Sequence, residues 1–318
     1  MTRPIRPVDL DGISTYALAD RDSKVARGDF ARHWTAGGRF TDFIDTLPKI
    51  LAGSQLRAVI DAVATAAQAD RTVMVGMGAH VIKVGLNPIL TDLMHRGVIS
   101  CLAMNGAGII HDVELAMTGR TSEDVAAALG DGAFGMARET GEFLAAAIQR
   151  AKTDALGLGR AVGAAINANG LPFAGESLLA AGAALDIPVT VHVAMGTDII
   201  HMHPQFDPAA AGAASHLDFR MFAGAVATLE NGVYLNVGSA VILPEVFLKA
   251  LTLVRNLGHT VNRFTTVNLD FIQHYRPATN VVHRPTLSGG RGFSLTGHHE
   301  IMLPLIAAGV IEALGTAR

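Results

Sequence analysis

The sequence predicts an α/β fold: a Rossmann-like, doubly wound and mostly parallel sheet with helices on both faces. Short β-branched runs alternate with helical patterns along the chain, which is typical of βαβ units. Each run ends in glycine or a small polar residue, as parallel strands do before a tight turn into a helix. Half of the 318 residues are hydrophobic and 17% are charged, so the chain can bury a large core.

Taken in chain order, the β-branched runs predict five buried strands. They lie at residues 72–75, 99–104, 187–194, 232–237 and 261–269. Helices are expected at residues 55–69, 135–154, 176–185, 214–230, 244–257 and 299–314. Two more should begin at Asn87-Pro88, with Asn87 as the N-cap, and at the acidic run Thr121-Ser122-Glu123-Asp124. The run Gly157-Leu158-Gly159 follows a helix and is interpreted as an ordinary turn.

The domain organisation is expected to be simple. No linker of proline, serine or charged residues divides the chain, and no repeat of 20 to 50 residues occurs. We expect a single α/β domain of the NAD-binding type over residues 51–318. An N-terminal extension, residues 1–50, should pack on this core or on a neighbouring subunit.

Composition excludes several classes of partner. The net charge is −3 and the basic residues are scattered, so nucleic acid is not expected to bind. No long apolar run and no signal sequence is found, which disfavours membrane insertion and export. The single cysteine, Cys101, lies in an apolar run and suits a small core residue in a reducing compartment. A cytoplasmic protein is therefore expected.

Chemistry should lie where the strands end, because ligands of an open parallel sheet bind outside the carboxyl ends of its strands. The glycine-rich turn Asn105-Gly106-Ala107-Gly108 would let a phosphate or ribose approach the backbone, with Asp112 one turn into the next helix. The spacing is not G-x-G-x-x-G, so the glycines are also explained by a tight turn. The other strand ends expected to matter are residues 76–80, 195–203, 236–239 and 268–270.

The richest polar segment runs from Met195 to Pro204, with His192 just upstream. The pair His201 and His203 beside Asp198 could chelate zinc, nickel or iron, provided that the backbone is extended there. Polar contacts with a substrate and hydrogen-bonded structural histidines are the alternatives.

Two further segments carry titratable groups. Near the C-terminus, a glycine-rich run at residues 288–292 is expected to be a mobile loop or an arm over a site, and His298 or His299 behind it could act as acid or base. A solvated helix start explains these histidines equally well. Lys83 has apolar neighbours, and burial among them would make it a candidate imine-forming nucleophile; a snorkelling lysine is the alternative.

The order of these pieces resembles the deoxyhypusine synthase family from about Asp29 to Val310. The segments that carry the resemblance are GMGAHVIKVGLNPIL, CLAMNGAGIIHD, IPVTVHVAMGTDIIHMHP, YLNVGSAVILPE, FTTVNLD and a GGRG run before LPLIAAGVI. The resemblance implies a Rossmann-type NAD site and a homotetramer with active sites between subunits. Members of the family use NAD to oxidise spermidine and transfer its aminobutyl group, through an enzyme imine, to a protein lysine or to a small amine.

The resemblance also implies a set of cofactor-binding residues. Residues 78–80 match the family's Thr-Ser-Asn triplet, and residues 105–108 match its Thr-Ala-Gly-Gly turn, with His111 at the acidic position that follows. Residues 238 and 239 match its triple-glycine turn. The residues expected to bind NAD are Gly78, His80, Asn105, Gly106, Gly108, Asp112, Gly238, Ser239, Asn268 and Asp270.

The substrate side departs from the family pattern. Asp198 and His203 resemble the aspartate and histidine of its polyamine segment, Gly-Asp-Met-Leu-Phe-Phe-His, but a second aspartate is missing. The family's Trp-Gly-Lys, which carries the imine lysine, is replaced by Thr296-Gly297-His298. The lysine that forms the imine in the family's transfer reaction is therefore absent from this position. The expected catalytic residues are Asp198, His203, His299 and Lys83.

Three functional hypotheses remain at this point. The first is an NAD-dependent transferase or oxidoreductase that acts on an amine of polyamine type and needs no metal, with Asp198 holding the substrate and His203, His299 or His111 as the base. The second is a metal-dependent hydrolase or lyase that uses His192, Asp198, His201 and His203. The third is a non-catalytic binding protein on the same fold.

Overall fold

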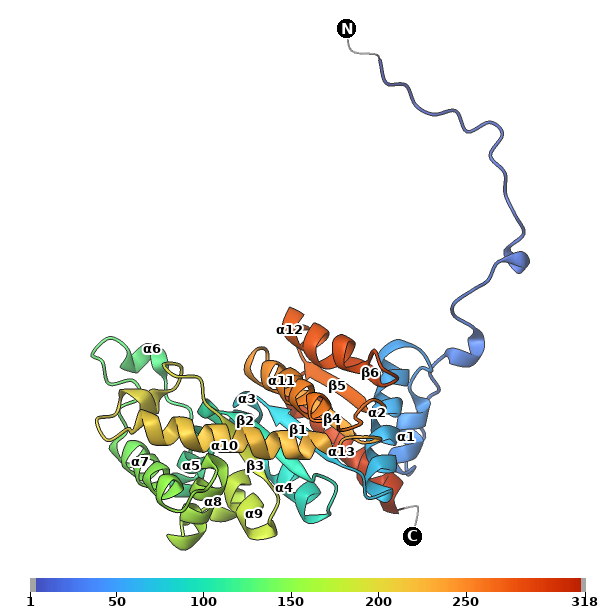
Figure 1. Cartoon of the computed structure of the whole chain (residues 1–318). Helices are drawn as coiled ribbons and strands as arrows, with labels where there is room; N and C mark the ends of the chain where they lie inside the picture. Colours follow the sequence, from blue (N-terminus) through green and yellow to red (C-terminus); the bar gives the residue numbers. More distant parts are fainter. Residues whose placement is uncertain (1–3, 316–318) are drawn as a thin grey trace.

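The computed structural model describes residues 4–315 and contains one six-stranded sheet (Figure 1). The sheet order is β3-β2-β1-β4-β5-β6, and all neighbouring strands are parallel. This is the doubly wound order of dinucleotide-binding folds, so the predicted fold class is confirmed. The strands are β1 (Val73–Met77), β2 (Cys101–Asn105), β3 (Val189–His192), β4 (Val233–Val237), β5 (Thr265–Asp270) and β6 (Arg291–Thr296).

The order of the strands reverses between β1 and β4. The chain first builds β2 and β3 on one side of β1 and then returns to place β4 on its other side. Met77 at the end of β1 is level with Met104 of β2 and Val237 of β4, so the three strands end together. In such sheets the ligand crevice opens outside the carboxyl ends at this reversal.

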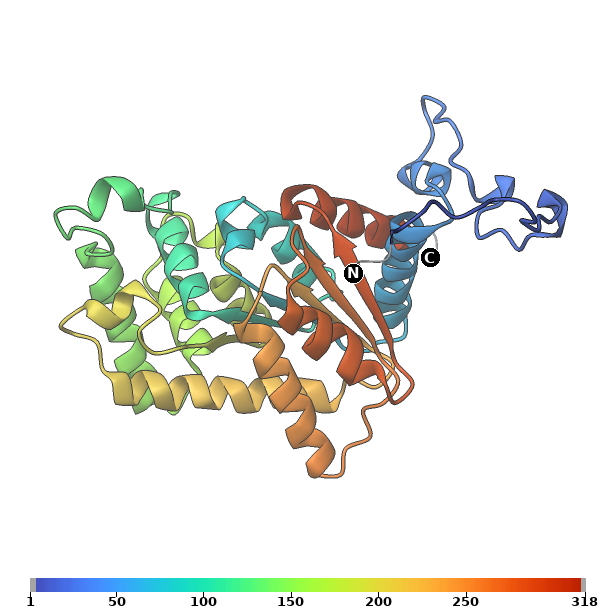
Figure 2. The same cartoon turned by 90° about the horizontal axis from the view of Figure 1, so that it is seen from above.

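Helices cover both faces of the sheet, as Figure 2 shows. Strand residues alternate between two apolar clusters: Val75, Met77 and Leu235 pack on one side, and Met74 and Tyr234 on the other. The second cluster is completed by α10 and α11 and includes the free, buried Cys101, as predicted. The helices are α1 (Phe40–Thr46), α2 (Leu51–Gln68), α3 (His80–Lys83), α4 (Asn87–His95), α5 (Gly106–Thr118), α6 (Val125–Ala128), α7 (Arg138–Thr153), α8 (Leu158–Ala168), α9 (Leu178–Leu185), α10 (Pro208–Ala227), α11 (Ile242–Asn256), α12 (Tyr275–Pro277) and α13 (His299–Gly315).

The glycine-rich run at residues 288–292 is not the expected arm over a site: its first residues form a turn, and residues 291 and 292 begin strand β6. Residues 291–296 pair in parallel register with β5, from Thr265↔Arg291 to Asp270↔Thr296. A Cβ at Gly292 would collide with the carbonyl oxygen of Val282. Glycine therefore serves close packing of this edge strand.

Two local predictions also need correction. Gly157 is the N-cap of α8, so the supposed turn at residues 157–159 is the start of a helix. A Cβ at Gly159 would collide with the carbonyl oxygen of Val189, so a small residue lets α8 pack against β3. Helix α4 has Leu86 rather than Asn87 as its N-cap, and the Asn87 side chain is buried within the first turn.

The N-terminal segment extends away from the body of the molecule (Figure 1). Several of its apolar side chains are exposed, among them Ile5, Val8, Leu10 and Leu18. The body begins at α1, which packs against α13. The predicted docking of this extension on the core or on another subunit stays a prediction.

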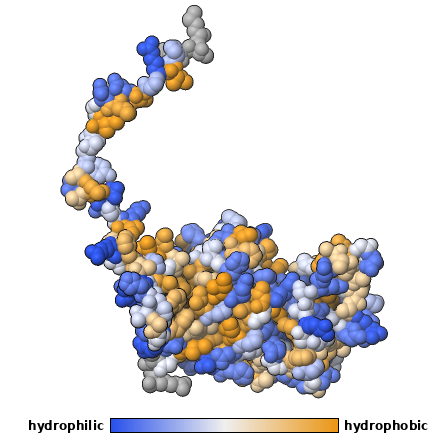
Figure 3. All heavy atoms as spheres, turned by 180° about the vertical axis from the view of Figure 1, so that it is seen from behind, coloured by the Kyte–Doolittle hydropathy of each residue, from blue (hydrophilic) through white to orange (hydrophobic). Residues whose placement is uncertain are grey.

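A broad apolar area lies on the face shown in Figure 3, which is the side of the sheet that α13 covers (Figure 2). Ile301 of α13 is 56% exposed, and Leu305 and Ala308 on the same face of the helix are partly exposed. None of the helices within residues 4–315 is both long and apolar enough to cross a bilayer.

Candidate functional site

Two glycine turns meet at the reversal of the sheet. Gly78 N donates to the carbonyl oxygen of Val237 at 3.0 Å, and Gly238 N donates to that of Leu269 at 3.0 Å. A Cβ at Gly78 would collide with the Gly238 carbonyl oxygen, and Gly238 itself has φ +65°. Both positions therefore require glycine, and the turns after β1 and β4 come into direct contact.

Aromatic and imidazole rings line the strand ends next to these turns. The ring centroids of His80 and His299 are 5.7 Å apart, and Phe271 stacks on His298 at 5.8 Å. His80, Phe271 and His298 are exposed, whereas His299 is buried. The exposed rings offer flat faces to a planar ligand at the crevice.

His299 lies under this group of rings, with only 1% of its surface exposed. Its Nε2 donates to the carbonyl oxygen of Leu269 at 3.2 Å and is 3.8 Å from Oδ1 of Asp270. Burial lowers the pKa of His299, although Asp270 opposes this effect. The neutral ring keeps a buried Nδ1 that has no hydrogen-bond partner. A role as base would require the substrate to reach this buried nitrogen.

The turn at residues 105–108 lies against Asp198. The Asn105 side chain accepts a hydrogen bond from Gly108 N at 3.2 Å and caps α5. A Cβ at Gly106 would collide with the carboxylate of Asp198, so glycine allows this approach. Asp198 is buried, its Oδ2 has no hydrogen-bond partner, and burial raises its pKa. An unpaired buried carboxylate oxygen at this edge is suited to a cationic ligand.

A cavity of about 190 Å³ opens beside this turn. It lies between α3, α5, the loop at residues 122–134 and residues 197–199. Its ionisable wall residues are Lys83, His111, Glu114, Glu123 and Asp198. Three carboxylates against one lysine give the wall an excess of negative charge. The structure thus brings Lys83 and Asp198, two of the predicted catalytic residues, to one site.

The sequence patterns did not point to two of the wall residues, Glu114 and Glu123, or to Thr121 beside them, as parts of a site. Glu114 follows His111 by three residues on α5, so the two share a helix face, which is a signal that could have been used. The carboxylate of Glu123 accepts a hydrogen bond from Gly135 N at 2.8 Å. The Thr121 hydroxyl is hydrogen-bonded to both His111 and Glu114. The loop carrying Thr121 and Glu123 reaches the cavity through tertiary contacts that no local pattern reveals.

Lys83 stands at the edge of the cavity and is exposed. The expectation that its apolar neighbours bury it is wrong, because Val81 and Ile82 point into the core while Lys83, at the end of α3, faces outward.

The histidines of the 195–204 segment do not converge. Residues Ile199–Met202 form a 3-10 turn rather than extended backbone, so the two imidazoles of the H-x-H pair diverge. His201 Nδ1 accepts hydrogen bonds from Gly196 N and Asp198 N at 3.1 and 3.2 Å. His203 is buried, and its Nε2 donates to the carbonyl oxygen of Gly135 at 2.9 Å.

His192 is also fixed within the fold. Its Nε2 lies 3.0 Å from the Thr190 hydroxyl, its ring packs edge-on against Phe222, and burial lowers its pKa to about 4. Within the described residues 4–315, no group of three or more His, Cys, Asp or Glu side chains is arranged to hold a metal. The metal hypothesis therefore has no preformed site there.

Asp112 is fully buried and binds protein donors. Its oxygens accept from the Ser177 hydroxyl at 2.5 Å, from Leu178 N and Leu179 N at 2.9 and 3.2 Å, and from the Asn87 amide at 3.1 Å. Burial raises its pKa to about 6, against the effect of these hydrogen bonds. In this arrangement Asp112 holds the start of α9 and the first turn of α4 on α5.

The polar residues after β4 and β5 shape their own turns. Asn236 donates to Asn268 Oδ1 at 2.8 Å and to the carbonyl oxygen of Ser239 at 2.9 Å. Ser239 accepts from Leu243 N at 3.1 Å, and Asn268 donates to Gln273 at 2.7 Å. Through these bonds Ser239 and Asn268 position the backbone around Gly238.

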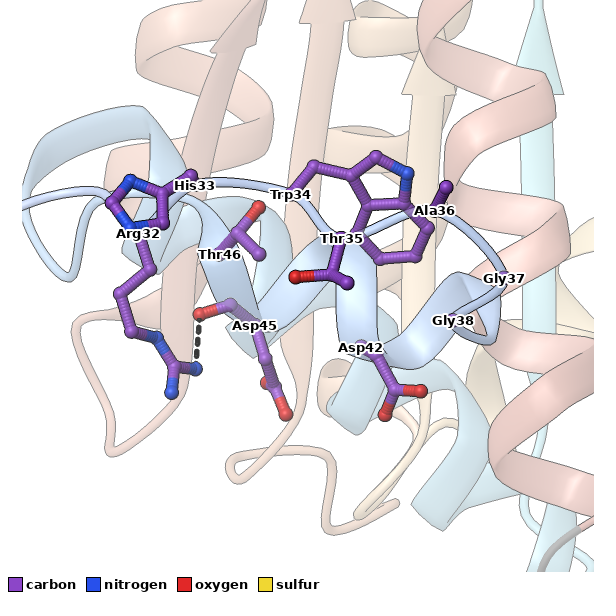
Figure 4. Close-up of a pocket in the computed structure, with 10 residues that line it drawn as sticks. All are labelled: Arg32, His33, Trp34, Thr35, Ala36, Gly37, Gly38, Asp42, Asp45 and Thr46. Carbon is purple, nitrogen blue, oxygen red and sulfur yellow. Dashed lines mark hydrogen bonds between the residues drawn. The ribbon is translucent and has the colours of Figure 1, made fainter.

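A separate hollow of about 530 Å³ lies at residues 32–46, away from the strand ends. Figure 4 shows Trp34, Asp42 and Asp45 on its walls, with Arg32 donating to the carbonyl oxygen of Asp45 at 2.8 Å. One stretch of chain builds this hollow, and Asp42 is already paired with Arg39.

Comparison with known proteins supports the fold. No protein-family model and no curated protein matches the sequence. A protein described as LOR/SDH from Methanococcus maripaludis S2 matches with a TM-score of 0.53 and 12% identity, over 83% of this chain and 71% of that one.

Two further solved structures extend this comparison. A protein described as a deoxyhypusine synthase from Entamoeba histolytica matches with a TM-score of 0.51 and 11% identity, over 89% and 96% of the two chains. AgrE, solved with ornithine and NAD+, matches with a TM-score of 0.51 and 15% identity, over 84% of this chain but only 34% of its own. The chain therefore has the fold of deoxyhypusine synthase-like and LOR/SDH structures, which confirms the predicted resemblance at the level of the fold.

Proposed function

We propose that the protein is an NAD-dependent enzyme that acts on a small cationic amine, as an oxidoreductase or a transferase. The observation that carries the proposal is the acidic cavity beside the 105–108 turn, at the carboxyl edge of a doubly wound sheet. That edge is where folds of this order bind dinucleotides, and an excess of carboxylates favours a cation.

The residues present fit a dinucleotide. Helix α5 begins at Gly106, directly after β2, so its first backbone N–H groups lie at the carboxyl edge of the sheet, where a pyrophosphate would bind. Gly78 and Gly238 let the two turns at the reversal of the sheet lie against each other. His80 and Phe271 offer ring faces beside Gly238. When bound, the nicotinamide supplies an acceptor for a hydride ion.

The amine would be held by Asp198 and Glu123. Asp198 Oδ2 lacks a partner, so an ammonium group would satisfy a buried acceptor without displacing a protein donor. Oxidation at the carbon next to the nitrogen removes a hydride and leaves an iminium ion. Attack by water would expel the amine and leave a carbonyl compound and reduced cofactor, which is the oxidoreductase outcome. Attack by a second amine would expel the first and form a new iminium ion, and return of the hydride from the reduced cofactor would complete the transfer.

We also propose that the enzyme is a cytoplasmic homotetramer with sites between subunits. The half-exposed apolar face of α13 supports self-association, because surfaces of this kind are rare on monomers. The buried, unpaired Cys101 suits a reducing compartment.

Cofactor binding is the first test. Equilibrium dialysis with NAD and NADH should give saturable binding at or below millimolar concentration. Absence of any uptake would refute the proposal.

Amine binding is tested with 1,4-diaminobutane in the presence of NAD. Asp198→Asn removes the unpaired carboxylate and should weaken binding about tenfold, since hydrogen bonds to charged groups are worth about 1.5–3 kcal/mol. Asp186→Asn is the matched control, because its side chain is 91% exposed and lies outside the cavity. Equal effects of the two substitutions would contradict the assignment of Asp198.

A further inference from the structure

His111 and Glu114, in the wall of the acidic cavity, are joined by Thr121 into a hydrogen-bonded row. His111 Nδ1 lies 2.7 Å from the Thr121 hydroxyl oxygen, and this hydroxyl donates to Glu114 Oε2 at 2.6 Å. The other oxygen of Glu114 accepts from the Thr140 hydroxyl at 3.3 Å. Thr121 thus stands between an imidazole and a carboxylate.

The row determines which nitrogen of His111 carries the proton. A carboxylate accepts hydrogen bonds only, so the single hydroxyl hydrogen of Thr121 is committed to Glu114. Towards His111, Thr121 can therefore only accept, and Nδ1 must carry a hydrogen. In the neutral ring Nε2 is then a bare acceptor.

His111 holds a single ring proton at neutral pH. Its pKa is lowered to about 4, mainly by burial and further by the charge of Lys83. Within residues 4–315, Nε2 makes no hydrogen bond, and His111 lines the cavity. The lone pair of Nε2 is therefore left for a ligand.

We propose that Thr121 and Glu114 fix His111 as a hydrogen-bond acceptor and that its Nε2 binds an N–H group of the substrate. The cavity would then select amines, which donate, over carboxylates and carbonyls, which only accept. The ligand part rests on the proposed function, whereas the position of the proton on His111 does not.

The same contact assists amine oxidation. The nicotinamide, when bound, would accept a hydride from the carbon next to an uncharged amine nitrogen; positive charge would then develop on this nitrogen, and its N–H would become a stronger donor. A hydrogen bond to Nε2 therefore strengthens in the transition state, which is the condition for acceleration. His111 would act as a catalytic residue, and Thr121 and Glu114 as positioning residues.

The position of the proton is tested directly by nitrogen NMR of protein labelled with ¹⁵N-imidazole histidine. The His111 signals are assigned by their loss in His111→Gln. We expect a protonated Nδ1 and a bare Nε2 in the wild type and in Thr121→Ser, which keeps the hydroxyl. Thr121→Val has the same shape without the hydroxyl and should show a mixture of the two tautomers. A protonated Nε2 in the wild type would overturn the proposal.

The ligand is tested with 1,4-diaminobutane and with succinate, which has the same carbon chain but no N–H donor. The wild type should bind the diamine and not the diacid. Thr121→Val should weaken diamine binding about tenfold, while Thr121→Ser leaves it unchanged.

Glu114→Gln separates the effect of the proton position from that of charge. Its amide oxygen can still accept from Thr121, so the NMR pattern should persist while diamine binding weakens. Failure of the wild type to bind the diamine would refute the amine site and the proposed function, and the NMR result would still decide the tautomer.

Discussion

Asp218 on α10 gives a quantitative prediction about stability. Its Oδ2 accepts hydrogen bonds from Gly159 N and Val191 N, both at 2.9 Å, and so joins α8 to the edge strand β3. Burial raises its pKa from the ordinary 3.8 to about 7, despite these hydrogen bonds. The folded protein therefore binds a proton more tightly than the unfolded chain does.

The sign of the pH dependence follows from this rise. The stabilisation by protonated Asp218 is fully present below about pH 4 and is lost as the pH rises through about 7. A pKa rise from 3.8 to about 7 corresponds to about 4 kcal/mol, because each pH unit is worth about 1.4 kcal/mol. Asp218→Asn keeps an oxygen acceptor for both backbone donors but removes the titration.

The assay is urea unfolding, followed by circular dichroism, between about pH 4.5 and about pH 8. The free energy of unfolding of the wild type, relative to that of Asp218→Asn, should fall by about 3–4 kcal/mol over this range. Asp186→Asn, an exposed aspartate near β3, should retain the wild-type slope. Identical slopes for the wild type and Asp218→Asn would refute the reasoning.

Four further predictions follow from the site and the surface. Gly238→Ala should abolish NAD binding in calorimetry, because its Cβ would lie 2.6 Å from the His299 ring, whereas Gly224→Ala, with open space around it, should not. Lys83→Gln should raise the pKa of His111 in an NMR titration, since Lys83 lowers it; an unchanged value would argue against their proximity. The contribution of His111 to diamine affinity should persist down to about pH 4, where the ring becomes protonated. A fall in affinity between about pH 7 and about pH 6 that is seen in the wild type but not in His111→Gln would contradict this. If the proposed homotetramer forms through α13, Leu305→Glu should lower the particle mass measured by light scattering, while Leu257→Glu, at an exposed position after α11, should leave this mass unchanged.

The sequence predicts most of the sheet because five strands are buried and lie in short, largely apolar runs that end in glycine or a small polar residue. It misses β6, since Arg291, Gly292 and Ser294 carry no strand pattern and the strand is half exposed. It also misses α8, because Gly157-Leu158-Gly159 favours a turn in the sequence, whereas Gly159 lets the helix approach β3.

The site was predictable only in part. Asp198 and the 105–108 turn follow strands directly, so their position at the carboxyl edge could be inferred from local order. Thr121 and Glu123 could not, because tertiary hydrogen bonds bring their loop to α5. The metal hypothesis required extended backbone at residues 201–203, and the 3-10 turn there is set by the bonds of His201 to its own backbone neighbours.

Gly135 links two segments that line the cavity, the loop after α5 and the segment after β3. Gly135 bonds through its N to Glu123 and through its carbonyl oxygen to His203, and a Cβ there would strike Ile199. The backbone of Gly135 thus connects the loop after α5 with the segment after β3 through these two hydrogen bonds. A side chain at Gly135 would push the segment after β3 away from the loop after α5, and would so change the spacing of two walls of the cavity without touching any of its charged groups.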